Sequence, residues 1–456
     1  MRIAINVACI VLSAIGVLYA VDDPYWIDNL EFVDFNSSGL GARSRAMGGV
    51  YLALDNEGCA SFENPATMVK TNKSLMSFDL TDYKDKHEKP YLFIYSTTNA
   101  DSNLILHPNP EKNLLKITQA GAVAPFTYFG RDWWIGGGYH TVYDFNLSYD
   151  IDIPEPWNPT NSYHREKTMD ALNMALATRL HEYLSMGLNI NYYTRRYEEE
   201  YLSRKVYFDT TVNSYVDFRN RDKSNFSGFN ADIGFFGEYD IFAAGLVIRT
   251  PYTLRQQVLQ KFTLLYAYGY EVGTIDRVTL KYKIPLSYAF GFSIRPIEQL
   301  TLAADLDIKP YSNVKMSLDY EINNIRDYQE RDAKWNDLTQ MRVGAEYIFD
   351  AGFAKIPLRA GYHNVPAIRF VSKMVIDTVT VDTSLTEQTT NVYSDKIKPA
   401  IISFGAGLKF ERIWFDLAYE FGSKKYDSQL VYVGLQHDMP FEFKYSRLNF
   451  SIGMLF

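Results

Sequence analysis

Two aspartates in the second half of the chain have the spacing that comes nearest to catalytic chemistry. Asp305 and Asp307 stand two residues apart in the stretch LTLAADLDIK. A β-strand would hold both carboxylates on one face, about 6.5–7 Å apart. Such a pair could serve in glycoside hydrolysis or bind a cation. The preferred interpretation is that they pair with a cation on a neighbouring strand, such as Arg295, as charges on strand faces commonly do.

Other chemistry-bearing residues show no catalytic arrangement in the sequence. The seven histidines lack the spacing of metal ligands, and no nucleophile elbow, phosphate-binding loop or zinc pattern occurs. The sequence therefore predicts a protein that is not an enzyme and that has no metal or cofactor. A net charge of −8 without a basic patch argues against a nucleic-acid partner.

The elements that would position these side chains are strands with one apolar face. In the final stretch, YSRLNFSIGMLF, every second residue from Leu448 to Phe456 is apolar, while Asn449, Ser451 and Gly453 between them are polar or small. A period of two is typical of a strand. It recurs along the chain, and an aromatic content of 15% also favours strands. The predicted strands, to within about two to four residues, cover 74–84, 89–98, 115–128, 131–150, 166–181, 183–201, 223–239, 241–256, 277–296, 299–314, 336–349, 355–366, 398–410, 412–425 and 446–456.

The face opposite the apolar one carries charges, and this decides between classes of β protein. A soluble sandwich or barrel has a dry interior, which disfavours charged side chains there. Sandwich strands usually have about five or six residues, whereas several of the strands predicted here are longer. Charges can instead line a wet lumen while the apolar face meets lipid. The sequence predicts an all-β, transmembrane, antiparallel up-and-down barrel of about fourteen strands in the outer membrane of a Gram-negative-type bacterium. The predicted lumen-lining residues are Arg179, Arg195, Arg295, Asp305, Asp307, Arg342, Glu346, Arg359, Lys409, Asp416 and Glu420.

The N-terminal part divides into two segments before the barrel, which covers 73–456. Residues 1–20 resemble a secretory signal peptide with cleavage after Ala20, and a membrane anchor is the alternative. Residues 21–72 do not alternate and are rich in glycine and apolar residues. They are too apolar for a disordered tail, so we expect a compact plug inside the lumen rather than a linker.

The connections between predicted strands differ in length, as an outer-membrane barrel requires. Tight turns such as FGRDW and RPIEQL should face the periplasm. Long connections should face outside, and these lie near 151–165, 202–222, 257–276, 315–335 and 367–397. The connection at 257–276 is the most apolar and either binds a ligand or packs over the barrel mouth. Its candidate ligand-binding residues are Phe262, Leu264, Leu265 and Tyr266.

The stretch GARSRAMGGVYLALDNEGCASFENPATM resembles the N-terminal hatch of the FadL/TodX family of outer-membrane transporters for hydrophobic compounds. The tripeptide Asn64-Pro65-Ala66 matches the family motif, although Thr67-Met68 follow where the family usually has Gly-Leu. Residues 335–366 and 402–421 are also similar to that family.

The resemblance implies a fourteen-stranded barrel with an N-terminal hatch. It also implies hydrophobic ligands, such as long-chain fatty acids or aromatics, that are captured at extracellular loops. Release would then follow hatch movement or pass through a lateral opening. The hatch and gating residues would be Arg43, Met47, Gly48, Gly49, Asn64, Pro65 and Ala66. The terminal Phe456 would belong to the signal read by the outer-membrane barrel assembly machinery.

Two alternatives remain at this point. One is a FadL-like barrel with a structural or secretion-associated role that binds protein partners at extracellular loops, for which the polar connection 367–397 is suited. The other is an open diffusion porin, which the plug-like N-terminal segment disfavours.

Overall fold

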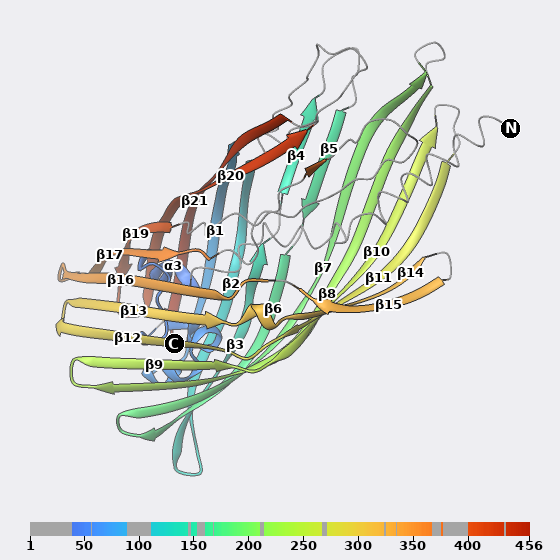
Figure 1. Cartoon of the computed structure of the whole chain (residues 1–456). Helices are drawn as coiled ribbons and strands as arrows, with labels where there is room; N and C mark the ends of the chain where they lie inside the picture. The colour runs from blue at the N-terminus through green and yellow to red at the C-terminus, as the bar shows by residue number, and fades with distance from the viewer. Residues whose placement is uncertain are drawn as a thin grey trace.

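The computed structural model shows a single closed ring of antiparallel strands around a small helical segment (Figure 1). The residues that it describes are 39–55, 57–88, 111–144, 147–152, 160–166, 168–209, 214–266, 271–322, 325–333, 335–366, 375–376, 400–432 and 435–456. The predicted signal peptide, the first part of the predicted hatch segment and the predicted strand 89–98 lie outside these residues.

Fourteen strands of the described residues form the ring, which confirms the predicted fold class. Each pairs antiparallel with the next, and β21 closes the ring on β1 from Leu75↔Leu455 to Glu88↔Glu442. In ring order, the strands are β1 (Leu75–Glu88), β2 (Glu111–Tyr128), β3 (Arg131–Asp144), β6 (Thr168–His181), β7 (Leu184–Asp209), β8 (Ser214–Tyr239), β9 (Phe242–Arg249), β12 (Ser287–Ile297), β13 (Leu300–Lys309), β16 (Leu338–Asp350), β17 (Lys355–Asn364), β19 (Ala400–Lys409), β20 (Ile413–Tyr432) and β21 (Leu435–Leu455).

The alternation of the sequence sets which side chains face outward. Along β6, Leu172, Met174 and Leu176 are exposed, whereas Asn173 and the alanines between them are buried. The same division holds on β19 and β20, where phenylalanines and leucines point away from the lumen. An apolar outer surface on a closed ring suits lipid, because closure leaves no strand edge to hydrogen-bond with water.

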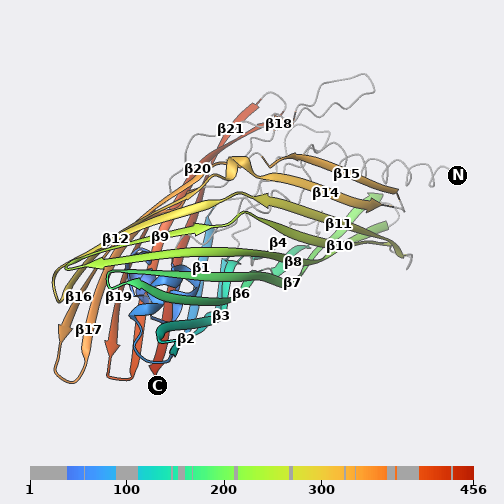
Figure 2. The ribbon, with the colours of Figure 1, turned by 90° about the horizontal axis from the view of Figure 1, so that it is seen from below.

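The connections between strands differ in length at the two ends of the ring. At one end, tight turns join β2 to β3, β6 to β7, β8 to β9 and β12 to β13, as the sequence predicts. At the other end, several expected long loops are paired strands, so those expectations were wrong. The additional elements are β4 (Leu147–Asp152), β5 (Thr160–Glu166), β10 (Tyr252–Tyr266), β11 (Glu271–Ile284), η3 (Tyr311–Asn313), β14 (Lys315–Ile322), β15 (Ile325–Asp332) and β18 (Val375–Ile376). Figure 2 shows β10, β11, β14 and β15 extending together beyond the ring.

Prolines mark the places where this extension leaves the ring. The predicted strands 241–256, 277–296 and 299–314 are each interrupted, at Pro251, Pro285 and Pro310 respectively. Proline cannot donate a hydrogen bond to a β-ladder. On the side of the breaks that leads to the tight turns, β9 pairs with β12. On the other side, β10 pairs with β8 and β11.

The chain ends against its own beginning. The amide of Phe456 donates to the carbonyl of Ser74 at 2.8 Å, and the Phe456 side chain is exposed. This position fits an aromatic end at the membrane boundary, while its role in assembly stays a prediction. None of the helices in the described part of the chain has the length and hydropathy needed to span a bilayer.

We expect Leu417→Arg to lower the free energy of unfolding by about 2–4 kcal/mol, the cost of a charge that faces lipid near the bilayer midplane. Leu417 points outward from β20 between Ala406 and Phe450 of the neighbouring strands. Denaturant titration in phospholipid vesicles would measure the loss, with Leu417→Met as the control. Equal stability of the two variants would contradict the outward orientation of this face.

Candidate functional site

The described residues before β1, 39–55 and 57–74, lie inside the ring, and we call them the lumenal segment. Its elements are α3 (Gly41–Ala46), η1 (Glu57–Cys59), α4 (Ala60–Glu63) and η2 (Pro65–Lys70). Figures 1 and 2 both show these short helices, in blue, enclosed by the strands. Most of their side chains are buried, polar ones included.

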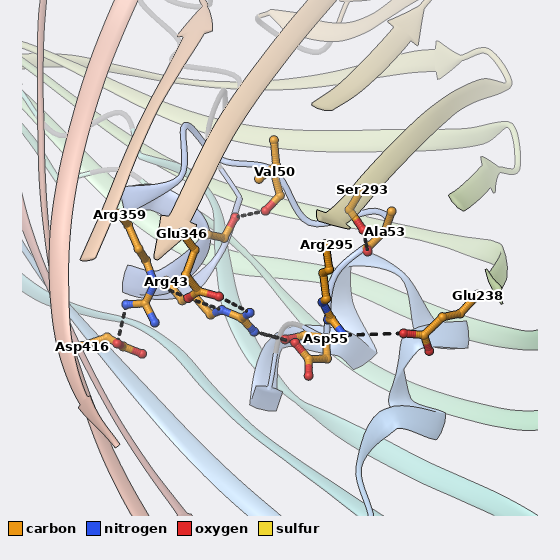
Figure 3. Close-up of polar contacts among 11 residues, drawn as sticks. Arg43, Val50, Ala53, Asp55, Glu238, Ser293, Arg295, Glu346, Arg359 and Asp416 are labelled. Atoms are coloured by element: carbon orange, nitrogen blue, oxygen red, sulfur yellow. Dashed lines mark hydrogen bonds and ion pairs between the residues drawn. The ribbon is translucent and has the colours of Figure 1, made fainter. Parts of the chain in front are cut away.

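A chain of alternating charges joins the lumenal segment to the wall (Figure 3). Arg43 of α3 forms a two-pronged contact with Glu346 of β16, with Nη2–Oε1 at 2.8 Å and Nε–Oε2 at 3.1 Å. Arg359 of β17 contacts the same carboxylate at 2.6 Å and Asp416 of β20 at 2.5 Å. Because Glu346 is 2% exposed, removing one of its partners would leave a buried charge incompletely paired.

Asp55 extends this network within the lumenal segment, where its carboxylate lies 2.6 Å from Arg43. Burial favours the protonated form, but the charge of Arg43 outweighs it and holds the pKa of Asp55 below its usual range. A lowered pKa means that the stabilisation is fully present above about pH 4, the ordinary pKa of an aspartate. It is lost only as the pH falls through the lowered pKa.

A second buried ion pair anchors the other side of α3. Arg45 contacts Glu420 of β20 at 3.0 Å, and Asn449 of β21 donates to the same carboxylate at 2.9 Å. The amide of Ala42 donates to Ser451 Oγ at 2.6 Å. Side chains of β16, β20 and β21 therefore hold α3.

Beyond α3, wall side chains satisfy the irregular backbone of the lumenal segment. The amides of Tyr51 and Leu52 donate to Asp305 Oδ2 at 2.7 and 3.2 Å. Ser293 of β12 donates to the carbonyl of Ala53 at 2.8 Å. Ser403 of β19 accepts from the amide of Gly48 at 3.0 Å. Unpaired buried backbone groups are costly, so these contacts make the segment specific to this wall.

The tripeptide Asn64-Pro65-Ala66 lies at the start of η2. It connects this helix to another part of the lumenal segment and to the ring. The Asn64 side chain accepts from the amide of Ala66 at 3.2 Å, and it donates to the carbonyls of Leu52 at 2.8 Å and Phe235 at 3.2 Å. Pro65 occupies the first helical position, where its missing N–H costs nothing. Ser185 of β7 donates to the carbonyl of Ala66 at 3.0 Å.

Close backbone contact at one point requires glycine on both sides. Gly48 has a φ of +70°, a backbone conformation that residues with a side chain rarely adopt. A Cβ atom added to Gly361 of β17 would lie 1.9 Å from the amide nitrogen of Gly48. The predicted hatch residues Met47 and Gly48 therefore pack directly on the wall.

A cavity of about 130 Å³ lies between the lumenal segment and the wall. It is at the ends of β9 and β13 that are remote from the tight turns, where Arg249 and Lys309 line it. Its other side chains are a mixture of aromatic rings, amides and charges. Among the described residues, no group of three His, Cys, Asp or Glu side chains is arranged to hold a metal ion.

Comparison of the whole chain finds no matching family model and no matching curated protein. Solved structures do match. The CymD monoaromatic hydrocarbon channel is 15% identical over 92% of this chain and 99% of its own, with a TM-score of 0.57. A FadL homologue of Pseudomonas aeruginosa is 14% identical over 92% and 98%, with a TM-score of 0.59.

A third match is the Pseudomonas putida toluene transporter TodX, which is 13% identical over 92% of this chain and 99% of its own, with a TM-score of 0.57. The chain has the FadL-type barrel fold. CymD is described as a channel and TodX as a transporter.

Within this FadL-type barrel, most of the predicted lumen-lining charges are buried against the lumenal segment or one another. These are Asp305, Asp307, Arg342, Glu346, Arg359, Asp416 and Glu420. Arg179 instead donates to the carbonyl of Val69 at 3.1 Å near the turn end. Arg295 lies 3.5 Å from Glu238 rather than beside the aspartates (Figure 3).

The two aspartates of the sequence pattern are not a catalytic pair. Asp305 accepts backbone amides of the lumenal segment, whereas Asp307 contacts Arg249 at 3.0 Å and Arg342 at 3.5 Å. Pairing with cations is confirmed for Asp307, although Arg295 is not among its partners. The two side chains therefore have structural rather than reactive surroundings.

The predicted ligand-binding residues Phe262, Leu264, Leu265 and Tyr266 belong to β10 rather than to a loop. Their backbone pairs with β11 as far as Leu265↔Glu271. A role in ligand binding stays a prediction. Sequence reasoning missed several residues that line the cavity, above all Arg249 and Lys309. Both stand at strand ends beside Pro251 and Pro310, which was the available signal.

We expect Glu346→Gln to loosen the lumenal segment by on the order of 3 kcal/mol, because Arg43 and Arg359 lose their shared buried carboxylate. Hydrogen exchange of the amides of residues 41–55 should become about a hundredfold faster. Glu330→Gln is the matched control, since Glu330 is exposed on β15 and contacts Lys283. Unchanged exchange in Glu346→Gln would show that the network does not hold the segment.

Proposed function

We propose that this protein is a passive transporter in the outer membrane of a Gram-negative-type bacterium, and that it admits small hydrophobic molecules. The observation that carries the proposal is the lumenal segment, which occupies the inside of a closed FadL-type ring and contacts its wall on many sides. A lumen occupied in this way disfavours an open pore for water-soluble compounds. The substrate class is supported by the similar solved structures of CymD, a monoaromatic hydrocarbon channel, and TodX, a toluene transporter.

The route begins at the strand extension and leads to the lumenal segment. A ligand captured at the β10–β11 and β14–β15 hairpins would reach the cavity between the segment and the wall. Release would require the residues from Arg43 to Ala66 to move. No bond of the ligand changes. Ligand binding can favour that movement only by the difference in its affinity for the two states.

Export and insertion belong to the same proposal. Residues 1–20 would act as the signal peptide, residues 21–72 as the hatch and residues 73–456 as the barrel, with Phe456 as part of the address read by the assembly machinery. The apolar outer face supports contact with outer-membrane lipid.

Proteoliposomes containing the purified protein should take up a fluorescent long-chain fatty acid faster than protein-free liposomes, and the rate should saturate. A small sugar serves as the hydrophilic control and should gain nothing. If the folded barrel accelerates neither solute, transport is wrong and the alternative, a barrel that binds protein partners, becomes the better account.

Deleting Gly41 to Met68 should open the lumen, because the charges of the wall would then face water. Single-channel conductance in planar bilayers should rise from near the baseline to that of an open pore. Heat-modifiable gel mobility would show that the shortened chain still forms a barrel. A conductance trace that does not change in the folded variant would contradict the gating role of this segment.

A further inference from the structure

The strand extension formed by β10, β11, β14 and β15 (Figure 2) has two faces of opposite character. Its inner face belongs to a buried apolar cluster that includes Val258 of β10, Leu280 of β11 and Met316 of β14. In the same cluster, the rings of Tyr282 and Trp335 stack with centroids 5.5 Å apart. Because alternate residues of a strand point to opposite faces, this cluster fixes which residues of the extension point outward.

The outward face of the extension continues the apolar outer surface of the ring, and β8 runs along both. The residues of β8 that share this face are, in order away from the tight turns, Phe235, Ile233, Ala231, Phe229, Ser227, Asn225 and Lys223. The face therefore changes from apolar to polar between Phe229 and Ser227. In register, Arg255 of β10 lies opposite Ser227, and Lys281 of β11 lies opposite Arg255. These two cations stand only about 6.5–7 Å beyond the level of Phe229.

Basic residues outnumber acidic ones on this outward face. Of the side chains that the structure describes there, the basic ones are Lys223, Arg255, Arg277, Lys281, Lys283, Lys315 and Arg326, and the acidic ones are Asp319, Glu330 and Asp332. Basic residues remain in excess when Glu321, opposite Arg277 in register, is counted as well. The whole chain has the reverse balance, with a net charge of −8. This face is therefore suited to an anionic surface.

Cations of neighbouring strands stand directly opposite one another on the outward face. Arg255 lies opposite Lys281, and Lys283 lies opposite Lys315. Like charges in directly opposite positions destabilise a sheet. Glu330 of β15 pairs with Lys283 at 2.9 Å, which offsets one of these four charges. An anion placed between opposite cations would remove the remaining repulsion.

A single carboxylate serves several cations further from the ring. Asp319 forms an ion pair with Arg326 at 2.5 Å. The hydrogen bond from Arg326 lowers the pKa of Asp319, and the charges of Lys281 and Arg255 lower it further. Within the described part of the chain, no carboxylate lies at ion-pair distance from Arg255, Lys281 or Lys315. Their charge can therefore be neutralised by a partner outside the chain.

We propose that the outward face of the extension binds the phosphorylated headgroups of lipids in the outer leaflet. With the tight turns toward the periplasm, the boundary at Phe229 lies on the outer-leaflet side. Basic side chains at such a boundary are attracted to anionic lipid, and phosphate accepts strong hydrogen bonds from arginine and lysine. One phosphate can thus bridge Arg255 and Lys281. The inference takes only the outer-membrane location from the proposed function and does not depend on transport.

Native mass spectrometry of the detergent-solubilised full-length protein would measure the binding of bisphosphorylated lipid A and of the same lipid with its phosphates removed. The phosphorylated form should bind at least about tenfold more tightly. Arg255→Gln/Lys281→Gln should weaken its binding about twentyfold, because each basic residue beside an anionic lipid surface contributes roughly fivefold.

The matched control is Lys355→Gln/Arg412→Gln, which also removes one lysine and one arginine. Both residues are exposed beside the short turns that join β16 to β17 and β19 to β20, so the control changes the net charge equally at the opposite end of the ring. The extension should remain folded in Arg255→Gln/Lys281→Gln, because the change removes a repulsion. Slow hydrogen exchange of the β11 amides would show this.

Equal binding of the phosphorylated and phosphate-free lipids by the wild-type protein would overturn the proposal. So would phosphorylated-lipid binding that is as strong in Arg255→Gln/Lys281→Gln as in the control, and an acidic protein would then be the better partner for this face. Fatty-acid uptake into proteoliposomes made without lipid A tests transport separately, so either proposal can fail while the other holds.

Discussion

The structure depends on the need to neutralise charges that a closed ring turns inward. Glu346, Asp416 and Glu420 lie on strands whose opposite faces must meet lipid, so they have no other direction to point. Buried charges are tolerated only with partners and hydrogen bonds. Arg43 and Arg45 of the lumenal segment supply partners to two of the three, and Arg359 supplies the third. Segment and wall are therefore one electrostatic unit.

The same requirement explains the small residues on the inner face. A helix that brings Arg43 and Arg45 to the wall must come within backbone contact of it, and Gly361 opposite Gly48 leaves the room. Serines at 293 and 403 then satisfy the nearest peptide groups. A larger inner face would have pushed the arginines away from their carboxylates, so packing and charge pairing constrain each other.

Much of the ring was predictable because alternation is a local property. Each strand reveals its two faces within about ten residues, so the fourteen ring strands and the orientation of Asp305 or Glu346 follow from the sequence. The partners do not. Arg43 and Glu346 are 303 positions apart, and their meeting depends on strand registers and on the path of an irregular segment. Neither has a periodic signal.

The prediction of the hairpin extension failed for a different reason. Its strands β10 and β14 were interpreted as connections, although Val258 and Met316 belong to one buried apolar cluster. The prolines at 251, 285 and 310 marked the boundary, since a central strand excludes them, but alternation continued across and concealed it. The cavity residues Arg249 and Lys309 sit at those same boundaries and were missed with them.

One short stretch of the chain contacts the cavity at one end and the ion network at the other. Tyr51 contacts Arg249 in the cavity, and its backbone is held by Asp305. Four residues later, Asp55 contacts the same Arg43 that Glu346 holds. A ligand that draws Arg249 away from Tyr51 weakens one hold on this stretch while leaving the Arg43 network intact. In the proposed transport function, opening would therefore have to break the Arg43 network as well.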